Sequence, residues 1–134
     1  MKVYRLRLYL VHGEERSAQT FWVDGEEYLL YQLLDQGCEL PRACEQGWCL
    51  ACAAKLLSGK VEMEAYLYYP QDIEAGFILL CSAKARSDLE VELDPHQTRR
   101  QMIQHRLDHN LLVRTYPRLG FRRGRAKKEG LPKP

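Results

Sequence analysis

Residues 40–56 read LPRACEQGWCLACAAKL, and the cysteines in this stretch decide the fold. Four residues separate Cys44 from Cys49, two separate Cys49 from Cys52, and 28 separate Cys52 from Cys81. Three cysteines within nine residues are hard to obtain from core packing alone. Because thiolates are soft metal ligands, the pattern predicts a metal centre with three ligands on one loop and a remote fourth.

The number and spacing of these cysteines indicate which metal group they hold. A pair of irons bridged by sulfide needs two terminal ligands per iron, and C-x4-C-x2-C with a distant fourth cysteine is typical of plant-type two-iron two-sulfur centres. Two alternatives remain open: ordinary buried cysteines, or a structural zinc. Zinc sites usually pair two C-x2-C hairpins, whereas only Cys49 and Cys52 form such a pair here.

The composition indicates the class of protein. The chain has 134 residues, of which 46% are hydrophobic and 28% charged, as expected of one soluble globular domain. No apolar run approaches the length of a membrane span, and the first residues do not resemble a secretory signal. Five cysteines, an odd number, suit a metal centre in a reducing compartment better than a disulfide scaffold. We expect a cytoplasmic protein, with the plastid stroma as the alternative, and no membrane association.

The hydrophobic periodicity predicts a mixed α+β domain that ends near Asp94, just before Pro95. Alternation with period two predicts strands, and a stripe of leucines predicts one main helix, for which Asp24 and Glu27 are the candidate N-cap pair. The predicted elements are strands over 4–10 and 19–23, a helix over 26–36, a hairpin of 53–57 with 60–64, a helical turn over 73–76, and strands over 77–80 and 89–93.

Several segments resemble the plant and cyanobacterial type of [2Fe-2S] ferredoxin. They are 40–44, 49–56, 58–61 and 73–81, with Ser87-Asp88 after them, and the resemblance covers about residues 3–94. It implies a β-grasp fold, in which a mixed sheet cradles one main helix and a [2Fe-2S] cluster lies near the surface at one end. It also implies that Cys44, Cys49, Cys52 and Cys81 bind the cluster as metal ligands.

The same resemblance implies a function. The chain would be a one-electron carrier and not an enzyme, and its partners would be redox proteins, namely a reductase and ferredoxin-dependent acceptors. We expect a monomer.

The cluster loop departs from the family's usual pattern. Glu45 stands where the family commonly has an arginine, and Leu50 and Ala51 stand where hydroxyl residues are common. Loss of a cation and of hydroxyl donors disfavours the reduced state, whereas a basic tail folded nearby would favour it. Trp48 would either cover the cluster or contact a partner. These departures favour a specialised ferredoxin with restricted partners.

Other candidate ligands are weaker. We interpret Cys38 as a core residue, because no partner thiol remains for it. His105 and His109 lie one helical turn apart, and His12 is isolated, but neither position has an acidic or cysteine companion in the sequence that would complete a metal site.

The net charge of the chain changes sign near Asp94, where the predicted α+β domain ends. Residues 1–94 carry 9 Lys and Arg against 16 Asp and Glu, a net −7, whereas residues 95–134 carry 11 against 2, a net +9. We therefore predict a ferredoxin-like domain over 1–94 and a basic C-terminal extension over 95–134. The extension would form a helix over about 96–112, with Ile103, Leu107 and Leu111 as its apolar stripe, and then a flexible tail.

Three explanations of the extension remain open. Its helix could dock on the acidic domain, its basic residues could bind an anionic partner, or it could be a solvated tail. Nucleic acid is disfavoured, because aromatic residues do not interleave with the charges. The functional alternative to a carrier is a cluster-containing sensor, or an assembly or regulatory protein, that binds an anionic partner through this tail.

Overall fold

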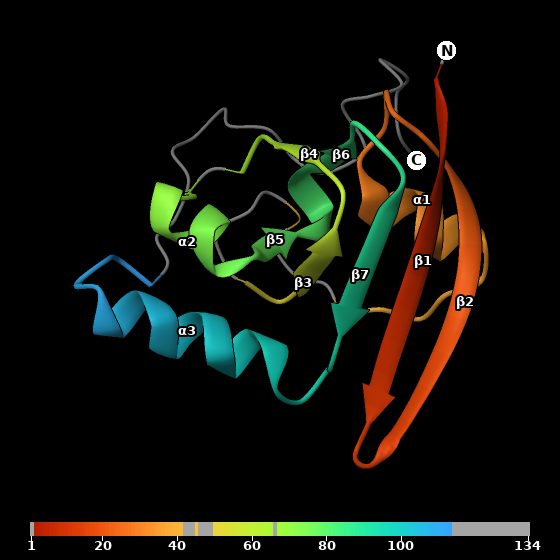
Figure 1. The fold of residues 1–134 in the computed structure, drawn as a ribbon. Helices are drawn as coiled ribbons and strands as arrows, with labels where there is room; N and C mark the ends of the chain where they lie inside the picture. The colour runs from red at the N-terminus through yellow and green to blue at the C-terminus, as the bar shows by residue number, and fades with distance from the viewer. Residues whose placement is uncertain (1, 42–44, 46–49, 66, 114–134) are drawn as a thin grey trace, which may run out of the picture.

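The computed structural model describes residues 2–41, 45, 50–65 and 67–113. A five-stranded sheet with the order β2-β1-β7-β3-β5 forms its centre, and β4 and β6 form a second, two-stranded sheet (Figure 1). The elements are β1 (Val3–His12), β2 (Glu15–Asp24), α1 (Leu29–Asp35), β3 (Ala53–Ser58), β4 (Val61–Met63), α2 (Pro70–Ala75), β5 (Phe77–Leu79), η1 (Leu80–Ser82), β6 (Ala83–Ala85), β7 (Leu89–Leu93) and α3 (Thr98–Asp108).

The large sheet is mixed. β1 pairs antiparallel with β2 along its whole length and parallel with β7, and β3 pairs antiparallel with both β7 and β5. Figure 1 shows α1 behind the β1–β2 hairpin, and α2 and α3 at the opposite end of the sheet. The architecture is the α+β class that the sequence predicts, with a mixed sheet and one main helix.

The core follows from the alternation that predicted the strands. Leu6 and Leu8 of β1 are completely buried and lie on one face of the sheet with Phe21 and Val23 of β2. The leucines of α1 pack into the same cluster. Fully burying one such side chain contributes about 1.5–3 kcal/mol. This packing holds α1 against η1, the segment that contains Cys81.

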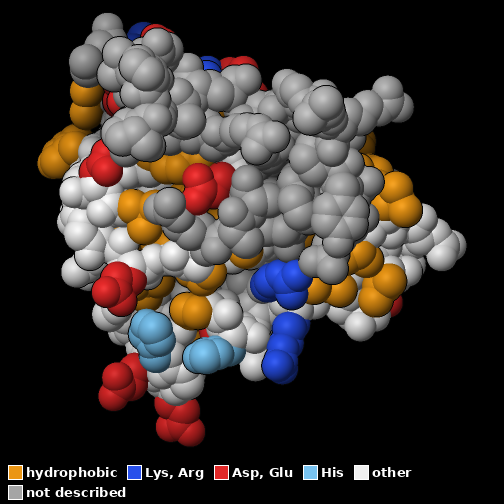
Figure 2. All heavy atoms as spheres, turned by 180° about the vertical axis from the view of Figure 1, so that it is seen from behind, with side chains coloured by type: hydrophobic (Ala, Val, Ile, Leu, Met, Phe, Trp, Pro, Cys, Tyr) orange, Lys and Arg blue, Asp and Glu red, His pale blue; other side chains and the backbone are white. Residues whose placement is uncertain are grey.

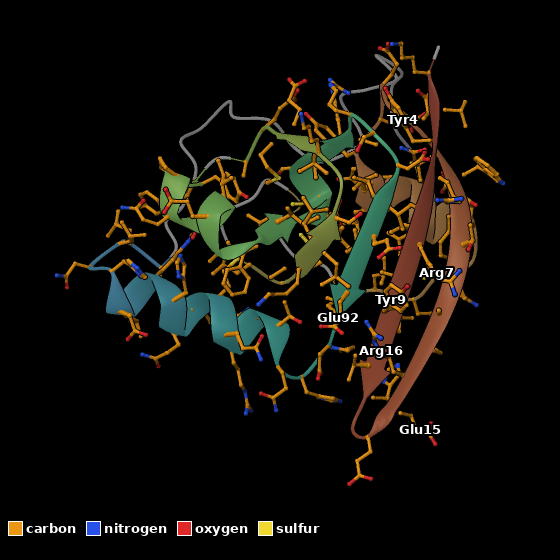
Figure 3. The ribbon with its side chains drawn as sticks, viewed as in Figure 1. Tyr4, Arg7, Tyr9, Glu15, Arg16 and Glu92 are labelled. Carbon is orange, nitrogen blue, oxygen red and sulfur yellow. The ribbon has the colours of Figure 1, made fainter. Side chains whose placement is uncertain are left out.

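The other face of β1 and β2 carries charged and aromatic side chains. The guanidinium of Arg16 lies 4.1 Å from the centre of the Tyr9 ring, and its Nε lies 3.3 Å from a carboxylate oxygen of Glu92 (Figure 3). Cation–π and ion-pair contacts at such exposed positions contribute about 1 kcal/mol or less. Among the described residues, the helices lie away from this face, which is polar.

Two local predictions are wrong. β3 and β4 do not form a hairpin, because β3 pairs with β5 and β7 while β4 pairs with β6. At the turn between them, Gly59 has a φ of +99°, and a Cβ there would lie 2.2 Å from the carbonyl oxygen of Asp88, so the chain is held against the start of β7. The helix N-cap is Tyr28, not Asp24, whose carboxylate instead accepts a hydrogen bond from the Glu26 amide.

The C-terminal helix α3 packs against β3 and α2, and only part of the predicted apolar stripe takes part, since Ile103 is partly buried against the core. Thr98, Met102 and Arg106 are its buried residues, whereas the Leu107 side chain is 54% exposed. The predicted tail follows residue 112, and all of it after Val113 lies outside the described part of the chain. None of the helices among the described residues is long and apolar enough to cross a membrane.

A buried ion pair explains why a basic residue takes the inner face of α3. Arg106 and Asp72 are both completely buried, and Nη2 of Arg106 lies 2.8 Å from Oδ2 of Asp72. The arginine also donates to the carbonyl oxygens of Leu67 (3.0 Å) and Val113 (2.8 Å), and Asp72 Oδ2 accepts from the Tyr69 amide at the start of α2. These partners together satisfy a pair of charges that would otherwise be costly to bury.

Replacing one partner of this pair should destabilise the fold. We expect Arg106→Met to lower the free energy of unfolding by about 3–5 kcal/mol, because it leaves the Asp72 carboxylate buried without its cation. The urea midpoint of the anaerobic holoprotein measures the change. Arg100→Met, at an exposed position of the same helix, is the matched control and should have little effect. Equal midpoints for the two variants would contradict the prediction.

Candidate metal centre

Two of the four predicted ligands, Cys52 and Cys81, lie together in the structure. Cys52 immediately precedes β3, Cys81 lies in η1, and both are buried, with exposures of 4% and 1%. The Cys81 backbone N–H donates to Sγ of Cys52 at 3.3 Å, although the two residues are 29 positions apart. A second hydrogen bond, between main-chain groups, joins the same two segments, from the Leu80 N–H to the Cys52 carbonyl oxygen at 3.2 Å.

The scaffold fixes η1 from the other side as well. The Glu64 N–H, just after β4, donates to the Ser82 carbonyl oxygen at 2.8 Å. The Glu64 side chain accepts a 2.6 Å hydrogen bond from the Tyr28 hydroxyl and pairs with Lys84 at 3.4 Å. The Tyr28 hydrogen bond is the main cause of the lowered pKa of Glu64. These contacts leave the Cys81 main chain little freedom to move.

Two residues that flank undescribed parts of the cluster loop have left-handed backbone. Glu45 has a φ of 58° and Leu50 a φ of 65°, conformations that cost an L-residue about 1–2 kcal/mol. Burial holds Leu50, whose side chain is 1% exposed. A hydrogen bond holds Glu45, because the hydroxyl of the buried Tyr31 on α1 donates to its carboxylate at 2.9 Å.

The other two predicted ligands, Cys44 and Cys49, lie outside the described residues, as does Trp48. Within the described part of the chain, no group of three His, Cys, Asp or Glu side chains could hold a metal ion. The described half of the site nevertheless suits a thiolate-bound cluster. Two buried sulfurs approach from different segments, and one of them already accepts a backbone N–H, the kind of donor that stabilises ligand sulfur.

The weaker candidate ligands lie apart from Cys52 and Cys81: Cys38 is in the core, and His105 and His109 are on α3, where Asp72 is an acidic neighbour that the sequence did not indicate. Cys38 belongs to the hydrophobic core, as predicted, and burial raises the pKa of its thiol. The rings of His105 and His109 lie 4.5 Å apart, and Nε2 of His105 lies 3.3 Å from Oδ1 of Asp72. Figure 2 shows histidine side chains at the surface with acidic side chains near them.

Comparison with known proteins identifies the family. Residues 13–86 match the 2Fe-2S iron-sulfur cluster binding domain, which is more than half of the chain. The chain belongs to this family. Membership confirms the predicted β-grasp fold, the [2Fe-2S] cofactor and the function of electron transfer.

Individual relatives agree with this assignment. Ferredoxin-2 of a Synechococcus species is 40% identical over 77 residues, which cover 57% of this chain and 73% of that protein. The chloroplastic Ferredoxin C 1 of Arabidopsis thaliana is 32% identical over 75 residues, 56% of this chain and 49% of the relative. The ferredoxin reductase component of a Rhodococcus rhodochrous 3-ketosteroid-9-alpha-monooxygenase is 45% identical over 62 residues, 45% of this chain but 18% of the relative. This chain thus spans about half or less of the latter two.

Among solved structures, a phthalate dioxygenase reductase superposes with a TM-score of 0.53 and 26% identity. The match covers 69% of this chain and 26% of the reductase. The ferredoxin domain of NdmD from Pseudomonas putida CBB5 gives a TM-score of 0.56 over 69% of this chain and the whole of that domain, at 23% identity, which supports the fold alone.

Sequence reasoning missed Tyr31 and Ser82. The hydroxyl of Tyr31 reaches the cluster loop from the main helix, 14 residues away, so only the tertiary structure shows the contact. Ser82, whose hydroxyl oxygen lies 3.4 Å from Sγ of Cys81, could have been noticed as the polar neighbour of a predicted ligand.

The contact between Tyr31 and Glu45 should matter for retention of the cluster. We expect Tyr31→Phe to speed cluster loss by about tenfold, because a hydrogen bond to a charged group contributes about 1.5–3 kcal/mol and this one holds a left-handed residue beside Cys44. The decay of visible absorbance in a chelator measures the rate. Tyr9→Phe, on the far face of the sheet, is the control. Identical decay in both variants would show that the contact does not hold the loop.

Proposed function

We propose that this chain is a one-electron carrier whose [2Fe-2S] cluster is held by Cys44, Cys49, Cys52 and Cys81, two thiolates on each iron. The main support is the burial of Cys52 and Cys81 side by side, with the amide of one aimed at the sulfur of the other. The cysteine spacing and the family membership support Cys44 and Cys49 as the other two ligands.

The residues around the site favour repeated electron transfer. When bound, the cluster takes up one electron and releases it again. The Cys81 amide places a partial positive charge at the Cys52 sulfur, where negative charge grows on reduction. The fixed main chain of β3 and η1 keeps both thiolates in place in the two states. The Glu45 carboxylate, next to Cys44 in sequence, opposes the added negative charge and so disfavours reduction.

We further propose redox proteins as the partners, namely a ferredoxin reductase as donor and a ferredoxin-dependent protein as acceptor. The names of two relatives support this, because they are reductase components of monooxygenases. In this proposal the chain has no substrate of its own, works as a monomer, and resides in the cytoplasm. Its domain boundary lies near Asp94, with the basic extension after it.

Metal and sulfide analysis tests the ligand assignment. We expect about two irons and two acid-labile sulfides per chain in the anaerobically purified protein. Cys52→Ala and Cys81→Ala should each lose the cluster and its visible absorbance, since one iron then lacks a ligand. Cys38→Ala, which also removes a buried thiol, should keep both. A colourless wild-type protein that contains zinc would overturn the proposal.

Electron exchange distinguishes a carrier from a sensor. Mixed in a stopped-flow instrument with a ferredoxin reductase and its reduced nicotinamide, the holoprotein should be reduced rapidly and should reoxidise with its cluster intact over many cycles. The visible absorbance follows both steps. A cluster that resists reduction, or is lost on reduction, would instead favour a sensor or regulatory protein.

A further inference from the structure

The Ser82 side chain lies directly against the fourth cysteine. Ser82 is completely buried and Cys81 is 1% exposed, and the Ser82 hydroxyl oxygen lies 3.4 Å from Sγ of Cys81. A thiolate bound to iron carries no hydrogen, so in the holoprotein only the hydroxyl can donate across this contact. We propose that the Ser82 hydroxyl donates a hydrogen bond to the Cys81 thiolate and thereby raises the reduction potential of the cluster. The inference rests on the proposed role of Cys81 as a ligand.

The local structure holds the hydroxyl in this position. The carbonyl oxygen of Ser82 accepts from the Glu64 N–H at 2.8 Å, and the next residue, Ala83, begins β6 and pairs with Met63. These contacts fix the main chain after the Ser82 Cα, and the hydrogen bond from the Cys81 N–H to Cys52 Sγ holds the main chain before it. Only rotation about one side-chain bond then moves the hydroxyl. At 3.4 Å, the Sγ of Cys81 is within hydrogen-bonding distance of this hydroxyl.

The environment strengthens the effect of this contact. Burial removes competing water and lowers the local dielectric, so a dipole aimed at the sulfur acts on it with little screening. Reduction adds a negative charge to the cluster, and hydrogen bonds to ligand sulfur stabilise that charge. Ser82 supplies a hydroxyl donor from outside the cluster loop, in which Leu50 and Ala51 provide none.

The alternative is that Ser82 only fills space beneath η1. Alanine differs from serine by one oxygen and would fill this space almost as well. A packing role therefore predicts no change of potential in Ser82→Ala, whereas a donor role predicts a lower potential with the cluster still bound.

Reduction potentials of matched variants test the proposal. In anaerobic spectroelectrochemical titrations of the holoproteins, Ser82→Ala should lower the equilibrium constant for reduction about tenfold, which is 59 mV for a one-electron couple. Ser82→Thr, which keeps the hydroxyl, should stay within about twofold of wild type. Ser87→Ala is the control, because it removes a hydroxyl whose bonds are to the main chain of the neighbouring turn.

A vibrational measurement adds a readout that packing would not change. The iron–sulfur stretching bands in resonance Raman spectra should shift on transfer to D2O in wild type, and the shift should be smaller in Ser82→Ala only. If Ser82→Ala binds no cluster, Ser82→Thr provides the test. A cluster bound to Ser82→Thr with an unchanged reduction potential supports the donor role. Loss of the cluster from Ser82→Thr as well overturns it.

The outcomes separate this inference from the function on which it rests. Iron and sulfide analysis of the wild type comes first, and absence of the cluster would refute the proposed function itself. If the cluster is present, equal potentials for wild type and Ser82→Ala would overturn only the role of Ser82.

Discussion

The hydrogen bond from the Cys81 amide to Sγ of Cys52 depends on the register of the sheet. β3 pairs with β5 so that Ala53 faces Leu79, which brings the residue before β3 next to the residues after β5. A slip of one residue would turn alternate side chains to the other face and separate the two sulfurs. The order and register of the central strands therefore place the half of the site that the structure describes.

The C-terminal helix supports this register indirectly. α2 leads into β5 through Gly76, and its Asp72 is held by Arg106 of α3 in a pair whose side chains are both completely buried. A buried pair of this kind adds little to stability compared with apolar packing, but it allows one arrangement of α2 and α3 and penalises others. Of the three explanations of the extension, docking on the domain is the one that applies to α3, residues 98–108. The role of the basic residues after Val113 stays a prediction.

The sequence correctly predicted the features that depend on residues close together in the chain. Alternation at Leu6 and Leu8 indicated the buried face of β1, and the cysteine spacing indicated the cofactor, because both signals lie within a few residues. The partner of β3 could not be predicted, since adjacent strands usually pair, whereas β3 lies between β7 and β5 and β4 pairs with β6. The position of Arg106 on the buried face of α3 was missed, because an arginine is normally predicted to be solvent-exposed. Its buried partner Asp72 lies 34 residues earlier in the chain, and the sequence alone does not pair the two.

The departures of the cluster loop from its family pattern have a structural reason at one position. Leu50, where hydroxyl residues are common, is 1% exposed and packs in the core, so its side chain stabilises a left-handed turn and cannot donate to sulfur. Ser82, in another segment, lies within reach of Cys81 and has the hydroxyl that Leu50 lacks. In the proposed arrangement, a hydroxyl in η1 influences the reduction potential of the cluster from outside the cluster loop. Residues of that loop, such as Glu45, can then differ from the family pattern while this donor is kept.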